Sequence, residues 1–120
     1  MKLNIDLKKL NHTFQSKPLL VGGLAMEYYG LRKAGADIDF IITTEDYEAL
    51  ANLYPEHKKD LFGDLGVAIH EFELWKCILL FEYDFLSQGA IEEDEIKVIS
   101  LEKLLFMKAL AISEPKYEQD

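Results

Sequence analysis

Only one cysteine, one tryptophan and three prolines occur among the 120 residues of this sequence. A single cysteine, Cys77, excludes a disulfide within the chain and fits a reducing compartment. No apolar run approaches the roughly 20 residues that a membrane helix needs. The first residues also lack the apolar core of a signal peptide. These absences predict a cytoplasmic protein.

Positive charge is also scarce, because 13 Lys and Arg face 22 Asp and Glu and leave a formal net charge of −9. Such a charge favours solubility and disfavours a broad electrostatic grip on nucleic acid. Hydrophobic residues make up 49% of the chain and charged residues 29%, which argues against disorder. A chain of 120 residues suffices for one core, so we expect a single domain over residues 1–120.

Hydrophobic periodicity predicts helices and strands in alternation, without repeats or linkers. Thr43 or Thr44 is the expected cap of one helix and Ser100 of another. We therefore expect an α+β fold with a mixed sheet of about five strands flanked by helices. The expected helices cover residues 5–14, 24–30, 45–54 and 101–112. The expected strands cover residues 18–23, 36–43, 67–75, 77–86 and 96–100, with a loop at residues 57–66.

Two carboxylates, Asp37 and Asp39, interrupt the apolar strand expected at residues 36–43. Residues i and i+2 of a strand point to the same side, so the two Cα atoms stand about 6.5 to 7 Å apart. Burying two like charges without a partner is costly, and a divalent cation such as Mg²⁺ removes that cost. The alternative is a solvated strand end, or pairing with Arg32 or Lys33.

Gly22 and Gly23 stand between the first expected strand and a short helix. A turn of this kind lets backbone N–H groups approach a phosphate closely. The simpler interpretation is a tight turn that needs glycine for a positive φ. A phosphate cradle beside a carboxylate pair is what metal-dependent nucleotidyl transfer requires, because the metal holds the triphosphate and activates the attacking hydroxyl.

The stretch GGLAMEYYGLRKAGADIDF, residues 22–40, resembles the signature of the nucleotidyltransferase superfamily, which has a polymerase-β-like fold. The spacing of fifteen positions from Gly22 to Asp37 is similar to that of small prokaryotic members, the abortive-infection-type toxins. VISLEKLLFMKALA, residues 98–111, and KYEQD, residues 116–120, resemble two further segments of the family. The resemblance therefore implies a nucleotidyltransferase-like fold over most of the chain.

The resemblance implies that Mg²⁺ is held by Asp37, Asp39 and a third carboxylate on a neighbouring strand. Asp84, in FEYDFL, is similar in position to the family's third aspartate, and the implied catalytic set is Asp37, Asp39 and Asp84. In that set Asp84 is also the expected base for the acceptor hydroxyl. Glu71 or Glu73 is the alternative third ligand, and the absence of any third ligand is the remaining one.

The implied substrate-binding residues are Gly22, Gly23, Lys33 and Lys108. Lys108 stands where family members carry a lysine on the helix after the last strand, and the resemblance implies a phosphate contact. A solvated helix face is the alternative for Lys108. Lys33 and its neighbour Arg32 are either triphosphate ligands or charge partners of the two aspartates.

The activity implied is Mg²⁺-dependent transfer of a nucleoside monophosphate from an NTP such as ATP to a hydroxyl acceptor. An RNA end, a protein side chain and a small molecule are the acceptor classes, and a toxin of this kind has an antitoxin as protein partner. Gly35 and Ala36 replace the Thr and Lys that members often carry, and the chain ends before the full C-terminal helix of many relatives. These departures favour the alternative, a nucleotidyltransferase fold without turnover that binds an NTP or a protein partner.

Overall fold

The computed structural model describes residues 3–113, which form nine strands, four α-helices and two short 3₁₀ helices. The strands are β1 (Leu19–Val21), β2 (Ile38–Ile41), β3 (Lys58–Leu61), β4 (Asp64–Ile69), β5 (Phe72–Trp75), β6 (Cys77–Ile78), β7 (Phe81–Glu82), β8 (Ile91–Glu92) and β9 (Lys97–Val98). The helices are α1 (Gly22–Tyr28), α2 (Thr44–Leu53), α3 (Tyr83–Leu86) and α4 (Leu101–Ser113), with 3₁₀ helices η1 (Leu7–Leu10) and η2 (Pro55–His57).

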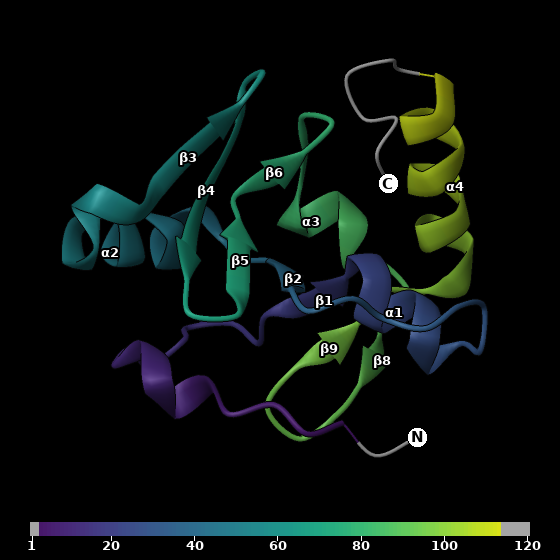
Figure 1. Cartoon of the computed structure of the whole chain (residues 1–120), viewed down its shortest axis with the longest axis horizontal. Coiled ribbons are helices and arrows are strands. Elements are labelled where there is room, and N and C mark those ends of the chain that lie inside the picture. Colours follow the sequence, from purple (N-terminus) through teal and green to yellow (C-terminus); the bar gives the residue numbers. More distant parts are fainter. Residues whose placement is uncertain (1–2, 114–120) are drawn as a thin grey trace.

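Seven strands form one mixed sheet in the order β3-β4-β5-β2-β1-β9-β8, and β6 and β7 form a separate two-stranded sheet. At the centre, β2 runs antiparallel to β1 and parallel to β5. Figure 1 shows β3, β4 and α2 at one side of the molecule and α4 at the other. The predicted α+β class is confirmed, and the sheet is larger than the five strands expected. Within residues 3–113, no helix is long and apolar enough to cross a membrane.

The register of β2 and β5 decides which side chains share a face of the sheet. Asp39 is paired with Glu73, and Ile41 with Trp75. Because side chains alternate along a strand, Phe40 belongs to the opposite face. There its ring packs with that of Phe72 at a centroid distance of 6.2 Å, and both side chains are buried. One face of the central strands is thus apolar, and the other carries two carboxylates.

The predicted caps of the two longer helices are present. Thr43 Oγ1 accepts a hydrogen bond from the Asp46 N–H at 3.2 Å, at the start of α2. Ser100 Oγ accepts one from the Lys103 N–H at 3.1 Å, at the start of α4. The helix expected at residues 5–14 is reduced to η1, because Asn11 adopts a left-handed conformation with a φ of 53°. Local capping signals therefore located the longer helices correctly.

The segment from residue 57 to residue 86 differs most from the prediction. The expected loop at residues 57–66 forms β3 and the first part of β4, which pair as an antiparallel hairpin. The single strand expected at residues 67–75 is divided between β4 and β5, which turn at His70. The strand expected at residues 77–86 is the β6–β7 hairpin followed by α3. Asp84 therefore lies on a helix, and its predicted place on a strand is wrong.

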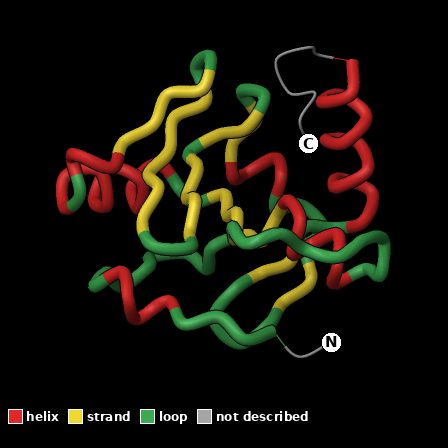
Figure 2. The backbone as a smooth tube through the Cα atoms, viewed as in Figure 1, coloured by secondary structure: helices red, strands yellow, loops and turns green. Residues whose placement is uncertain are grey.

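Turns at positive φ explain these differences. Phe62 and Gly63 join β3 to β4 with φ values of 53° and 95°, and Leu79 and Leu80 join β6 to β7 with values of 52° and 66°. Two-residue turns with both φ values positive favour Asn-Gly or Asp-Gly, so a Leu-Leu turn gives no local signal. Figure 2 shows the tips of both hairpins. The two turns lie close together, because a Cβ built on Gly63 would lie 3.4 Å from Leu80 Cδ2.

A buried aspartate from β4 holds the Leu79–Leu80 turn in place. Asp64 is 1% exposed, and its carboxylate accepts hydrogen bonds from the Leu79 N–H at 2.8 Å and the Leu80 N–H at 2.9 Å. A non-glycine residue in the left-handed region carries a conformational cost. The two charge-assisted hydrogen bonds offset that cost. The turn of the β6–β7 hairpin therefore depends on Asp64, which precedes Leu79 by 15 residues and Leu80 by 16.

The thiol of Cys77 is expected to react slowly in the folded protein. Cys77 is buried, and burial raises the pKa of its thiol, with the Asp64 carboxylate acting in the same direction. A raised pKa leaves less thiolate at pH 8, and the thiolate is the reactive form. We expect modification by a disulfide reagent at pH 8 to be about 100-fold slower in buffer than in denaturant. Equal rates in the two conditions would contradict this burial.

Candidate functional site

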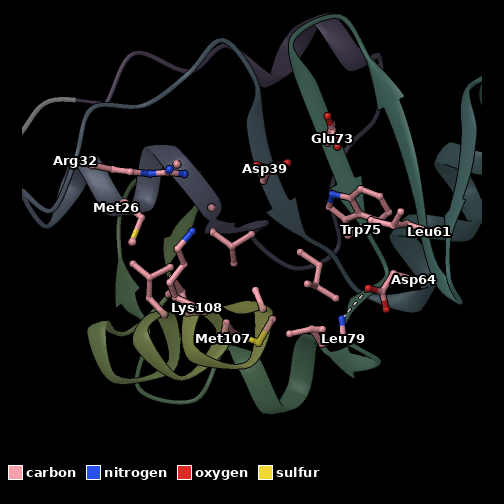
Figure 3. A pocket seen from close by; sticks show the side chains of 17 residues that line it. Met26, Arg32, Asp39, Leu61, Asp64, Glu73, Trp75, Leu79, Met107 and Lys108 are labelled. Atoms are coloured by element: carbon pink, nitrogen blue, oxygen red, sulfur yellow. Dashed lines mark hydrogen bonds between the residues drawn. The ribbon is translucent and has the colours of Figure 1, made fainter. Parts of the chain in front are cut away.

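A pocket of about 230 Å³ opens between the carboxylate face of the central strands and α4 (Figure 3). Gly22 and Gly23, at the junction of β1 and α1, also line it. The rest of its lining is apolar apart from five charged side chains. These are Arg32, Asp39, Asp64, Glu73 and Lys108. Mostly apolar walls with a few convergent charges are typical of small-molecule sites.

Asp39 is the only predicted catalytic carboxylate that lines this pocket. It is half-buried on β2, where it is paired with Val21 of β1 on one side and with Glu73 of β5 on the other. Gly22 packs directly against its side chain, since a Cβ built on Gly22 would lie 2.6 Å from Asp39 Oδ2. Gly22 also has a φ of +67°, which side-chain-bearing residues rarely adopt. Gly22 is therefore required at this position by both space and conformation.

Glu73 is the carboxylate that lies beside Asp39. Both line the pocket from neighbouring parallel strands that are in register, and Figure 3 shows them on these adjacent strands. Glu71 lies outside the pocket lining and binds Lys9, whose Nζ lies 2.9 Å from Glu71 Oε2. The hydrogen bond from Lys9 lowers the pKa of Glu71. Asp84 is exposed on α3 and does not line the pocket.

Asp37 occupies a different environment from Asp39. It precedes the first residue of β2, is exposed and is not part of the pocket lining. The structure therefore separates the two carboxylates that the sequence motif groups together. Asp37 is solvated at the start of the strand, as the alternative interpretation of the Asp37–Asp39 pair predicts. Asp39 lines the pocket.

Two basic side chains line the same pocket as the carboxylates. Lys108 reaches it from α4 and is half-buried, and Arg32 reaches it from the segment between α1 and β2. Figure 3 shows both on one side of Asp39, with Glu73 and Trp75 on the other side. Lys33 is exposed and lies outside the lining, so Arg32 is the basic residue of this segment that the fold brings to the site.

A hydrogen bond between backbone and side chain shapes the segment that carries Arg32. Glu27 of α1 accepts a hydrogen bond from the Ala34 N–H at 2.8 Å, which ties the segment back to the helix. Gly23 faces this segment, because a Cβ built on it would lie 3.6 Å from an Arg32 guanidinium nitrogen. That is an ordinary contact distance, so Gly23, unlike Gly22, has room for a methyl group.

The chemistry of the donor set is compatible with Mg²⁺. Asp39 and Glu73 provide hard carboxylate oxygens on neighbouring strands. No group of three or more His, Cys, Asp or Glu side chains among residues 3–113 is arranged to hold a metal ion. Mg²⁺ in nucleotide sites is usually held by one or two carboxylates, with substrate phosphates and waters completing its shell. Two protein carboxylates are thus sufficient for an ion that arrives with a nucleotide.

The apolar wall of the pocket depends on another glycine. Trp75 of β5 is paired with Gly66 of β4, and a Cβ built on Gly66 would lie 2.6 Å from Trp75 Cε3. The indole therefore packs directly against Gly66, where any side chain would clash with it. Met107 and Leu104 of α4 line the pocket together with this indole. The resulting surface is apolar and partly aromatic, next to the carboxylate pair.

No family of known proteins, no curated protein and no solved structure matches this chain. The stretch at residues 98–111 that resembles the family lies on the end of β9 and on α4, and it contributes Lys108 to the pocket. The stretch at residues 116–120 lies outside the described residues.

Proposed function

We propose that this protein is a Mg²⁺-dependent nucleotidyltransferase, which moves a nucleoside monophosphate from an NTP to a hydroxyl acceptor. The observation that carries the proposal is the pairing of Asp39 with Glu73 on neighbouring strands, facing a pocket that Arg32 and Lys108 also line. Two carboxylates for a divalent cation beside two cations for a polyphosphate are what this chemistry needs. The resemblance of residues 22–40 to the superfamily signature supports the same conclusion.

Asp39 and Glu73 are the residues that would hold Mg²⁺, whereas Asp37 is exposed before β2 and lies outside the pocket lining. When bound, Mg²⁺ neutralises phosphate charge and lowers the pKa of a coordinated hydroxyl. Glu73, rather than Asp84, is the carboxylate placed to accept the proton of the acceptor hydroxyl, because Glu73 lines the pocket and Asp84 does not. Attack on the α-phosphate then releases pyrophosphate.

Lys108 and Arg32 have the charge to bind the triphosphate oxygens, and their position at one side of Asp39 keeps the phosphates near the carboxylates. Gly22 and Gly23 contribute only backbone to the lining of the pocket. The apolar surface at Trp75 is suited to the nucleoside part. The acceptor is then an RNA end, a protein side chain or a small molecule, and the net charge of −9 disfavours a large RNA surface.

The second candidate function is a nucleotide-binding module without turnover. Gly35 and Ala36, in the segment before β2, have no side-chain hydrogen-bonding groups for a substrate. Such a module would bind an NTP or a protein partner such as an antitoxin in the same cytoplasmic setting. Pyrophosphate release with candidate acceptors distinguishes the two functions, because only the transferase produces it.

Thermal unfolding with each of the four NTPs tests nucleotide binding. We expect one or more NTPs to stabilise the wild type only when Mg²⁺ is present, by about 2.7 kcal/mol at 100-fold excess over Kd. Asp39→Asn should lose this stabilisation, because it removes a metal-ligating charge from the pocket. Asp84→Asn removes the same charge from an exposed helix and should retain it. The absence of a shift with every NTP would contradict the transferase and would leave only a module that binds a protein partner.

A further inference from the structure

A lysine of the edge strand β3 reaches the site across the neighbouring strand. Lys59 is paired with Gly66 of β4, and Gly66 is paired in turn with Trp75 of β5. Gly66 has no side chain, and the indole of Trp75 packs against its backbone on the face to which Lys59 also belongs. Its Nζ lies 5.6 Å from the centre of the Trp75 ring and 3.6 Å from Glu73 Oε1. Lys59 thus contacts both the aromatic wall of the pocket and Glu73, one of the two carboxylates proposed to hold the metal.

The contact between Lys59 and Glu73 has the properties of an exchangeable ion pair. The side chain of Lys59 is 45% exposed and that of Glu73 is 23% exposed. An ion pair of this length between partly hydrated groups is weak. The position of the ammonium over an indole adds an attraction that is also modest at an exposed site. A divalent cation such as Mg²⁺, which prefers carboxylate oxygens, therefore competes effectively with the Lys59 ammonium for Glu73.

We propose that Lys59 is an internal counter-cation of Glu73, which a divalent cation must displace in order to bind Asp39 and Glu73. The inference rests on the proposed metal site. An ammonium and a divalent cation at one carboxylate repel each other, so occupancy by the metal moves Lys59 away from Glu73 and from the indole of Trp75. Lys59 thereby sets the concentration of Mg²⁺ at which the site fills.

The chain contains a matched control for this role. Lys58 precedes Lys59 on β3, is also exposed and carries the same charge. Because side chains alternate, Lys58 belongs to the other face of the strand. Lys58→Gln and Lys59→Gln therefore change the net charge of the protein equally, and only Lys59→Gln removes the counter-cation of Glu73. Both substitutions are at exposed positions and leave the core unchanged.

Trp75 is the only tryptophan in the chain, so its emission reports directly on the contact with Lys59. Titration of the wild type with Mg²⁺ alone should change this emission as Lys59 leaves the ring. Lys59→Gln should show little change at any Mg²⁺ concentration, and Lys58→Gln should follow the wild type. The affinity itself is measured with Mn²⁺ by electron paramagnetic resonance, in the absence of nucleotide.

Lys59→Gln is expected to lower the Kd for Mn²⁺ by about two- to fivefold, the range that corresponds to a weak ion pair. Lys58→Gln should change it less, and Asp39→Asn should abolish binding. Equal effects of the two lysine variants, or weaker binding by Lys59→Gln, would overturn the counter-cation role and leave the metal site standing. If the wild type binds no Mn²⁺ either alone or after addition of ATP, the metal site itself is wrong, and the inference falls with it.

Discussion

Asp64→Ala is expected to lower the free energy of unfolding by about 3 kcal/mol or more. The carboxylate of Asp64 is buried and accepts hydrogen bonds from two consecutive backbone N–H groups, those of Leu79 and Leu80. Without it, both donors lose their partner while the two leucines keep their unfavourable positive φ. Urea unfolding of the purified variant measures the loss.

Asp60→Ala is the matched control, because Asp60 also accepts a hydrogen bond at a hairpin tip, from the Gly63 N–H at 2.8 Å, but in an exposed position. Asp60→Ala should lower the free energy of unfolding by less than about 1 kcal/mol.

A second variant tests the conformational strain of the Leu79–Leu80 turn. Leu79→Asn combined with Leu80→Gly gives the turn its preferred residues and should stabilise the protein by about 1 kcal/mol. A loss for Asp64→Ala no greater than that for Asp60→Ala would contradict this role of Asp64.

Gly22→Ala is expected to destabilise the protein by about 2 to 4 kcal/mol. An alanine there must adopt a φ of +67°, and its Cβ would lie 2.6 Å from Asp39 Oδ2. Relief of that contact requires Asp39 or the start of α1 to move, so the geometry of the carboxylate pair changes as well. We expect the Mg²⁺-dependent stabilisation by NTPs to be lost with it, as measured by thermal unfolding.

Gly23→Ala separates this effect from a general sensitivity of the Gly-Gly turn. A Cβ on Gly23 would meet its neighbours at 3.6 Å or more, which is ordinary contact. Since Gly23 lies within α1, alanine should be neutral or stabilise the protein by about 0.5 to 1 kcal/mol. Equal destabilisation by the two substitutions would show that crowding against Asp39 is not what makes Gly22 necessary.

Local sequence signals predicted a helix or strand correctly where the residues of that element alone specify it. The strand before Gly22, the short helix after it and the strand that contains Asp39 all occur as predicted, within one or two residues at the ends. Thr43 and Ser100 cap the helices that follow them. In each case the hydrophobic period or the cap lies inside the element, so no distant part of the chain is needed to recognise it.

The hairpins between residues 57 and 86 could not be recognised in the same way. Their turns use Phe62, His70, Leu79 and Leu80 at positive φ, where glycine and asparagine are the usual residues, and only the β3–β4 turn contains a glycine, Gly63. A distant side chain compensates in one of them, because Asp64 stabilises the Leu79–Leu80 turn. Without recognisable turns the sequence predicts one strand through Asp84, and it leaves Glu71 or Glu73 only as the alternative third ligand.

By itself, the sequence determined an α+β fold, the Gly22 turn and a carboxylate at Asp39 that follows it by one short helix. Only the tertiary structure decided that Glu73, and not Asp84, is the neighbour of Asp39, because strand pairing sets which residues lie side by side. The same pairing brings Lys59 across Gly66 to Glu73. Contacts of this kind depend on the register between strands, which no local pattern of residues specifies.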